Sequence, residues 1–265
     1  MKILNKNSRI FEYRDHIVKL PEEDINIEIY YKKPKFLRQL VGLYSINVND
    51  FSYSRALRFT DFDGRLPSIK STFKYPGILL EYAFQKISRR FVMKNPKPFL
   101  VVDAVDYIKK HIDNKSRVLE VGAGNSTLWF LINGCNVTSL EHNKEWAEEI
   151  LKHAKMSNSL RFSNLLIEVC EGQQALKFLN DTSEKYDVIL VDSMNFHTSR
   201  YESIKILKNR LTENGILVLD NSDGVVNWKA MDVMRGIKCK KFSGYAYNCP
   251  YVSQTTVWHS TDILT

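Results

Sequence analysis

The chain contains a glycine turn of a kind that can approach a ligand closely. Residues 117–121 have the pattern of a buried strand, and Gly122 and Gly124 follow it almost directly. Glycine has no Cβ, so the backbone can turn sharply there and lie against a bound molecule. Asn125 and Ser126 then favour the start of a helix, whose first N–H groups would point back at the turn. This arrangement favours a nucleotide-like ligand.

An acidic residue follows at the spacing expected for a ribose contact. Residues 136–140 are rich in β-forming side chains and end at Glu141, which lies roughly 20 residues after Gly122. A carboxylate at the tip of the second strand of such a unit reaches ribose hydroxyls. The dinucleotide fingerprint has a third glycine near position 127, where this chain has Thr127. That difference disfavours NAD as the ligand.

Three oxygen-bearing side chains follow two further strands. Residues 186–191 are nearly continuously apolar, as expected when helices cover both faces of a parallel sheet, and they end at Asp192. Residues 216–219 form the next apolar run, and Asp220 and Asn221 follow it. Because open parallel sheets bind ligands at their carboxyl edge, these three side chains could hold one Mg²⁺. Alternatively, Asp192 only shapes a cofactor pocket, and Asp220 and Asn221 start a turn.

Taken together, these residues resemble the motif series of class I S-adenosylmethionine-dependent methyltransferases. The resemblance covers residues 96–265 and implies S-adenosyl-L-methionine as the cofactor. It implies that the glycine turn lies along the methionine part of the cofactor, that the acidic residue binds ribose, and that the loop after the third strand touches adenine. By position, the implied cofactor-binding residues are Glu120, Gly122, Ala123, Gly124, Asn125, Ser126, Glu141, His142, Gly172, Gln173, Gln174 and Asp192.

The carboxyl-edge residues also resemble the metal triad of catechol-type and macrolide-sugar-type O-methyltransferases. The implied metal ligands are Asp192, Asp220 and Asn221. Catechol-type enzymes carry a lysine three residues after the first aspartate, and here Asn195 stands there. The general base would therefore be another group, and the candidate catalytic residues are Asp192 and His197.

The expected fold is α/β: a seven-stranded, Rossmann-like, doubly wound sheet, mostly parallel, whose last strand runs antiparallel between the fifth and sixth. Residues 238–243 and 254–259 are expected to form the final two strands. A helix is expected over 201–211, and the Asn214–Gly215 pair would end it.

The first 95 residues are expected to form a basic, aromatic-rich accessory or lid region that is mainly helical, and residues 96–265 the methyltransferase domain. Short and long helices are expected over 36–43 and 78–93, with an apolar stripe that includes Leu80 on the longer one. The basic residues near the end of that helix suit a solvated helix face, an acidic lipid surface or an anionic substrate.

Charge is spread unevenly along the chain. Residues 1–117 carry 23 Lys and Arg against 13 Asp and Glu, whereas the remainder carries 15 against 17. The basic excess therefore belongs to the N-terminal region and indicates an anionic partner. Aromatic and basic residues interleave between positions 51 and 75, which leaves RNA binding open beside ordinary loop packing.

Composition indicates a cytoplasmic protein. The four cysteines lack Cys-x-x-Cys spacing, so we expect reduced thiols, and the sequence shows neither a signal-peptide pattern nor a bilayer-spanning run. It also lacks the Gly-x-Ser-x-Gly elbow, the phosphate loop and the His-Glu-x-x-His zinc helix, which disfavours those enzyme classes.

The function predicted from these observations is S-adenosylmethionine-dependent methylation, on oxygen of a small-molecule or saccharide-type substrate, with Mg²⁺ as a candidate second cofactor. The substrate is expected to be anionic, and contact with a membrane surface stays open. The alternatives are an RNA methyltransferase, an aminopropyl- or NAD-using enzyme on a similar sheet, and a catalytically inactive methyltransferase-fold binding protein.

Overall fold

A computed structural model gives the arrangement of the chain. It describes residues 2–5, 10–13, 16–19, 28–31, 60–61, 63–87, 96–156, 162–193, 199–224, 227–247, 249 and 251–263. For the four segments between residues 2 and 31 it describes the backbone alone.

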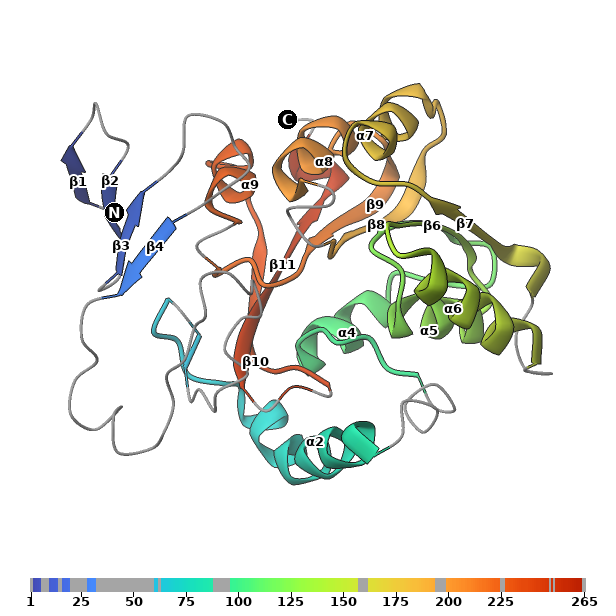
Figure 1. Ribbon diagram of the computed structural model, residues 1–265, viewed down its shortest axis with the longest axis horizontal. Coiled ribbons are helices and arrows are strands. Elements are labelled where there is room, and N and C mark those ends of the chain that lie inside the picture. The colour runs from blue at the N-terminus through green and yellow to red at the C-terminus, as the bar shows by residue number, and fades with distance from the viewer. Residues whose placement is uncertain are drawn as a thin grey trace.

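A seven-stranded sheet forms the centre of the molecule, with the strand order β10-β11-β9-β8-β5-β6-β7 (Figure 1). The strands are β5 (Arg117–Val121), β6 (Asn136–Glu141), β7 (Leu165–Val169), β8 (Tyr186–Val191), β9 (Leu211–Leu219), β10 (Lys240–Tyr245) and β11 (Val252–His259). β11 lies between β9 and β10 and runs antiparallel to both, while the other neighbouring pairs are parallel. The predicted sheet and its single antiparallel strand are confirmed.

Helices cover both faces of this sheet, because alternate residues of the buried strands point to opposite sides. Val118 packs in one apolar cluster with residues of α5 (Asn125–Ile132), such as Phe130, whereas the adjacent Leu119 packs in a second cluster with Ile204 of α8 (Arg200–Leu207). The helices of this part are α4 (Val102–Lys109), α5 (Asn125–Ile132), α6 (Lys144–Met156), α7 (Gly172–Asp181), α8 (Arg200–Leu207), α9 (Trp228–Val233) and α10 (Ser260–Ile263), and a 3-10 turn spans Phe162–Asn164.

The helix expected over residues 201–211 is shorter than predicted. α8 ends at Leu207, and β9 begins at Leu211, so Gly215 lies within the strand and does not end the helix. A Cβ on Gly215 would stand 2.8 Å from the carbonyl oxygen of Tyr186 on the neighbouring strand. Glycine at this position therefore allows the two backbones to approach closely, at the point where the pairing of β8 and β9 shifts register.

The N-terminal extension is not as helical as expected. It contains a four-stranded antiparallel sheet of β1 (Lys2–Asn5), β2 (Ile10–Tyr13), β3 (His16–Lys19) and β4 (Glu28–Tyr31). The long helix α2 spans Ile69–Ile87 and includes Pro76, so it begins at Ile69 and not at Ile78 as predicted. The helix predicted over 36–43 lies outside the described residues.

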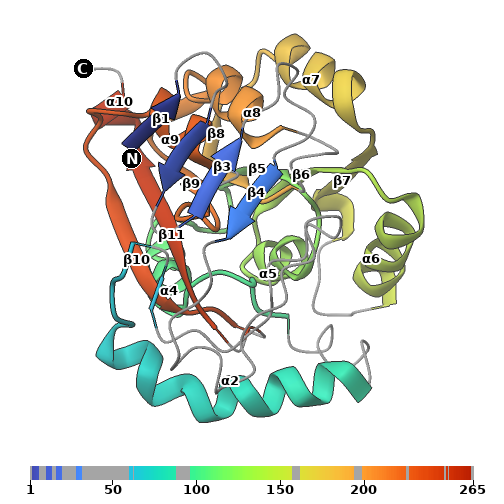
Figure 2. The same cartoon turned by 60° about the vertical axis from the view of Figure 1, so that its left-hand side comes forward.

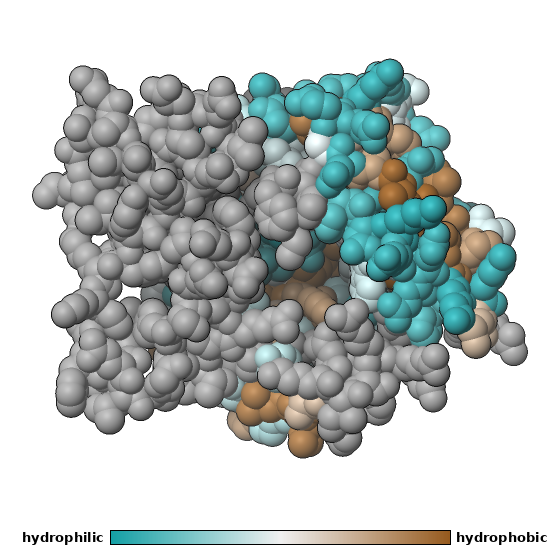
Figure 3. All heavy atoms as spheres, in the orientation of Figure 1, coloured by the Kyte–Doolittle hydropathy of each residue, from teal (hydrophilic) through white to brown (hydrophobic). Residues whose placement is uncertain are grey.

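The helix α2 crosses the end of the β10–β11 ribbon (Figure 2). Ile78 is buried there, whereas Phe73 and Leu80 are 84% and 62% exposed, so Leu80 does not face the core as predicted. Apolar side chains are accordingly visible over α2 at the lower edge of the surface (Figure 3). Among the described residues, no helix combines the length and apolar character needed to cross a bilayer.

Candidate functional site

The glycine turn after β5 brings two loops of the sheet edge into backbone contact. Gly122 has a φ of +103°, and a Cβ there would lie 3.0 Å from both the carbonyl oxygen of Asp192 and the amide nitrogen of Ser193. Gly124 differs, because its φ of −174° is ordinary extended backbone, and the nearest atom to an added Cβ is Oγ of Ser126 at 3.9 Å. The space beside Gly124 is therefore open to a ligand.

The carboxylate of Glu120 lies buried under this turn, and two hydroxyl groups hold one of its oxygens. Thr127 and Ser139 both donate to Oε2 of Glu120, and the Ser139 bond is 2.8 Å long. The Thr127 hydroxyl also accepts a hydrogen bond of 2.9 Å from the N–H of Gly124. These contacts join the end of β5, the turn and the start of α5 into one unit.

Burial raises the pKa of Glu120 to about 7, and the nearby charge of Asp192 adds to this effect. The hydroxyl groups of Ser126, Thr127 and Ser139 oppose the rise, because they favour the ionised form of the carboxylate. Glu120 is therefore a buried acid that changes charge near neutral pH.

Two buried polar atoms beside the turn have no partner within the described part of the chain. They are Oε1 of Glu120 and Nδ2 of Asn125, the first residue of α5. An unpartnered buried polar atom is costly, and buried polar groups in proteins are nearly always hydrogen-bonded. One atom is an acceptor and the other a donor, so together they suit a ligand that carries both kinds of group.

The predicted ribose-binding residue Glu141 ends β6 beside the turn. Its carboxylate accepts hydrogen bonds from the N–H groups of Ala123, at 3.0 Å, and Asn143, at 2.8 Å, and it lies 2.9 Å from Nδ1 of His142. The indole N–H of Trp146 donates a hydrogen bond of 2.9 Å to the carbonyl oxygen of Ala123. Each carboxylate oxygen can accept more than one hydrogen bond, so these contacts leave capacity for a ligand.

The predicted adenine-contacting residues follow β7 at the same edge of the sheet. Gly172, Gln173 and Gln174 form the exposed first turn of α7, and Gly172 has a φ of +52°. The N–H of Cys170, just before them, donates to the carbonyl oxygen of Glu141 at 2.9 Å, which keeps the two strand ends together.

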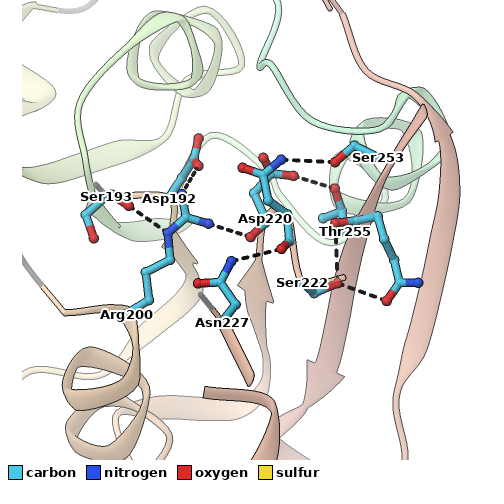
Figure 4. A network of polar contacts seen from close by, with 10 residues as sticks. Asp192, Ser193, Arg200, Asp220, Ser222, Asn227, Ser253 and Thr255 are labelled. Carbon is cyan, nitrogen blue, oxygen red and sulfur yellow. Dashed lines mark hydrogen bonds and ion pairs between the residues drawn. The ribbon is translucent and has the colours of Figure 1, made fainter. Parts of the chain in front are cut away.

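A buried arginine occupies the carboxyl edge between β8 and β9 (Figure 4). The guanidinium group of Arg200, the first residue of α8, donates to the carbonyl oxygens of Ser193, at 2.6 Å, and Asp220. It also donates to Oδ1 of Asp192 at 2.9 Å. Three loop ends of the site therefore share one cation.

The other two predicted metal ligands are also bonded to protein groups. Oδ1 of Asp220 accepts a hydrogen bond of 2.7 Å from Thr255, and the amide nitrogen of Asn221 donates to Oγ of Ser253 at 3.0 Å. Asn221 has a φ of +48°, a left-handed conformation that asparagine tolerates better than most residues. Burial raises the pKa of Asp220 well above its usual range, the charge of Asp192 adds to this, and Arg200 opposes it.

These contacts do not fit the predicted Mg²⁺ site. A divalent ion bound to Asp192 would have to displace or closely approach the guanidinium group of Arg200, against charge repulsion. Within the described ranges, no three His, Cys, Asp or Glu side chains are grouped so as to hold a metal ion. The second candidate catalytic residue, His197, lies outside the described residues.

Sequence reasoning missed Arg200 and the hydroxyl group of Thr127. A signal for Arg200 was present: Ser199 caps α8 by accepting from the N–H of Glu202, so Arg200 occupies the first turn of that helix. A cation there opposes the helix dipole and indicates a compensating carboxylate nearby. Thr127 was noted as the position where the dinucleotide fingerprint has a glycine, although the hydroxyl group of a buried threonine near a buried glutamate can bond to its carboxylate.

The strand order and the single antiparallel strand are those of the class I methyltransferase fold. Among solved structures, the cofactor-bound protein Rv0187 from MTB matches 73% of this chain and 96% of its own, at 14% identity and a TM-score of 0.51. The chain has the class I fold. At that identity, the likeness establishes the fold and not the reaction.

Other solved structures match with lower TM-scores. A candidate O-methyltransferase from Klebsiella pneumoniae is 12% identical over 70% of this chain and 89% of its own, with a TM-score of 0.49. Spermidine synthase from Thermotoga maritima is 15% identical over 57% of this chain, with a TM-score of 0.44, and the match spans only 55% of that protein's length. The sequence matches no family model and no curated protein sequence.

Proposed function

We propose that this protein is an S-adenosylmethionine-dependent methyltransferase that acts on an oxygen atom of a small-molecule or saccharide-type substrate. The observation that carries the proposal is the pair of unpartnered buried atoms, Oε1 of Glu120 and Nδ2 of Asn125, beside the open space at Gly124. The amino acid end of S-adenosylmethionine offers both a donor and an acceptor. Its amino group would donate to Glu120, and its carboxylate would accept from Asn125.

The remaining contacts of the cofactor follow along the sheet edge. Glu141 would accept from the ribose hydroxyls, and residues 172–174, at the exposed start of α7, would contact the adenine ring. His142 and Ala123 lie beside Glu141 and complete this part of the proposed site. When bound, the cofactor supplies a methyl group that is activated by attachment to a sulfonium.

The chain's part in the transfer is alignment and proton removal. The substrate oxygen would form the new bond to the methyl carbon while the carbon–sulfur bond breaks, with its electron pair staying on sulfur. The hydroxyl proton would go to a carboxylate or imidazole, and we propose Asp192 and His197 for this step. Asp192 is half-buried at the carboxyl edge, and its second oxygen is not held by Arg200. The proposal includes no Mg²⁺.

The accessory region is proposed to provide substrate contacts. Residues 1–95 form the proposed lid, residues 96–265 the proposed catalytic domain, and the basic excess of the N-terminal part supports an anionic substrate. The cysteine spacing, which lacks a Cys-x-x-Cys pair, supports the proposed cytoplasmic location.

Calorimetric titration of the purified protein with S-adenosylmethionine, S-adenosylhomocysteine and NAD tests the proposal. We expect micromolar binding of both sulfur compounds, and at least tenfold weaker binding by Asn125→Ala. Because Nδ2 of Asn125 bonds to no described protein group, this variant should keep its thermal stability. Asn136→Ala, at an exposed position of β6, is the matched control and should bind normally.

The alternatives predict different results. Folded protein that binds neither sulfur compound would refute the methyltransferase proposal and favour a binding protein. A preference for decarboxylated S-adenosylmethionine would favour aminopropyl transfer, because that compound lacks the carboxylate assigned to Asn125. Steeply salt-dependent binding of RNA, together with cofactor binding, would favour an RNA substrate and is motivated by the basic N-terminal region.

A further inference from the structure

The strongest feature beyond the cofactor site is the position of Arg200. Its side chain is only 7% exposed, whereas that of its partner Asp192 is 27% exposed. The guanidinium group therefore lies behind the carboxylate, and the accessible member of the pair is Asp192. Burying a cation is costly unless it is paired and hydrogen-bonded, and here Arg200 bonds to a carboxylate and two carbonyl oxygens.

The guanidinium group of Arg200 lies where a metal ion of the predicted site would bind. A metal held by Asp192 and the Asp220–Asn221 turn would lie between the ends of β8 and β9. Arg200 bridges these two ends, because it donates to the side chain of Asp192 and to the main chain of Asp220 (Figure 4). Its third bond, to the carbonyl oxygen of Ser193, fixes the direction of the planar group.

The groups around Arg200 suit a cation that donates hydrogen bonds in fixed directions, as a guanidinium group does. The carboxylate of Asp220 is directed to Thr255, and the amide nitrogen of Asn221 to Ser253, so both side chains are engaged with β11. The main chain after Asp220 is held as well, because Asn227 donates to the carbonyl oxygen of Asn221 at 2.8 Å. A spherical ion that needs six oxygen ligands would require these contacts to rearrange.

We propose that Arg200 is the built-in cation of this site, so that it replaces the divalent metal, holds one oxygen of Asp192 and leaves the other oxygen for the substrate. Arg200 is thus a positioning residue that acts through Asp192. The inference deepens the proposed function, because it specifies methyl transfer without a metal at the same carboxyl edge. It predicts that, once the guanidinium group is removed, Asp192 and Asp220 rearrange around a metal ion that is supplied in solution.

Binding of Mn²⁺, followed by electron paramagnetic resonance, tests this inference without any substrate. The wild-type protein should leave the signal of free Mn²⁺ unchanged. Arg200→Ala should bind one Mn²⁺ at least tenfold more tightly than wild type, because the two carboxylates then lack their cation. Arg200→Lys keeps a positive charge and should gain little, and adding Asp192→Asn to Arg200→Ala should abolish the gain.

Two outcomes of the Mn²⁺ experiment would overturn the inference. One is stoichiometric Mn²⁺ binding by the wild-type protein that disappears in Asp192→Asn, a result that needs no Arg200 variant to fold. The other is a folded Arg200→Ala that binds Mn²⁺ no better than wild type. Titration with S-adenosylhomocysteine in Mg²⁺ and in EDTA separates this test from the proposed function: loss of binding in both solutions refutes the cofactor, whereas binding only in Mg²⁺ refutes the built-in cation.

Discussion

Thr127 donates a hydrogen bond from its hydroxyl group to the buried carboxylate of Glu120, and the same hydroxyl group accepts from the N–H of Gly124. The contact joins residues on either side of the glycine turn. It leaves Oε1 of Glu120 as the oxygen without a described partner. The bond from Thr127 therefore determines that Oε1, and not Oε2, is the carboxylate oxygen left for a ligand.

Replacing Thr127 by valine should destabilise the protein by about 1–3 kcal/mol, because Oε2 of Glu120 and the N–H of Gly124 each lose a buried hydrogen-bond partner. Urea denaturation measures the change. Thr127→Ser, which keeps the hydroxyl group, is the control and should retain more stability than valine. If valine is the more stable of the two, the hydroxyl bridge does not hold the turn.

The raised pKa of Glu120 makes stability depend on pH. The folded protein keeps the proton up to about pH 7, whereas the unfolded chain releases it near the ordinary value of 4.5. The stabilising contribution is complete below pH 4.5 and is lost as the pH rises to about 7, by on the order of 3 kcal/mol. Denaturation of wild type and Glu120→Gln between pH 5 and 8 should show the wild type losing stability relative to the variant. Parallel pH curves would contradict the assignment.

The cofactor proposal adds a second pH effect at the same residue. An ammonium group binds best to an ionised carboxylate, so affinity for S-adenosylmethionine should rise with pH until about 7 and then level off. Glu120→Gln should bind more weakly and without this rise. Calorimetry from pH 5.5 to 8 gives the answer, and an equally steep rise in the variant would assign the effect to another group.

The two glycines of the turn should respond differently to alanine. Gly122→Ala places a side chain at positive φ against the backbone of Asp192 and should cost at least about 1 kcal/mol of stability. Gly124→Ala meets only a distant Ser126 and should stay within about 1 kcal/mol of wild type. Thermal unfolding measures both. In the proposed cofactor site, Gly124→Ala should nevertheless weaken S-adenosylhomocysteine binding, since the new methyl group enters the open space.

Gln254 ties the segment before α2 to the sheet. It is fully buried on β11 and donates from Nε2 to Asp61, at 2.8 Å, and Asp63, at 2.9 Å, while Oε1 accepts from Ser222 at 3.1 Å. Gln254→Glu would place a carboxylate against two others and should cost on the order of 3 kcal/mol. Gln174→Glu is the same change at an exposed position and should cost little, as judged by chemical denaturation. Equal stability of the two variants would contradict this role for Gln254.

The sheet could be predicted because its strands are long apolar runs separated by clear turns. Residues 186–191 and the run ending at Glu141 needed no tertiary information, since burial on both faces leaves a continuous apolar pattern. The end of α8 could not be predicted in this way. Glycine is required at position 215 because the backbone of Tyr186, on another strand, lies close to it. The local sequence alone favours a helix end at such a glycine.

The residues of the candidate site likewise differ in how far the sequence predicts them. Glu141 and Asp192 were identified because strand ends of a parallel sheet converge, which is a property of topology, whereas Glu120 was implied by the resemblance to class I methyltransferases. Whether Asp192 meets a metal ion or a guanidinium group depends on the direction of one long side chain, Arg200, and the helix start alone leaves that direction open. The N-terminal sheet of β1 to β4 was missed for another reason, because its strands are only four residues long.

The place of β11 in the sheet has a consequence for the order of assembly. Within the described part of the chain, β10 bonds to the main sheet only through β11, which comes later in the chain and inserts between β9 and β10. We therefore expect β10 to join the sheet only together with β11, as an antiparallel pair. The polar side chains buried on β11, Ser253 and Thr255, must find Asn221 and Asp220 in that same step, so the carboxyl edge reaches its final form only when the sheet closes.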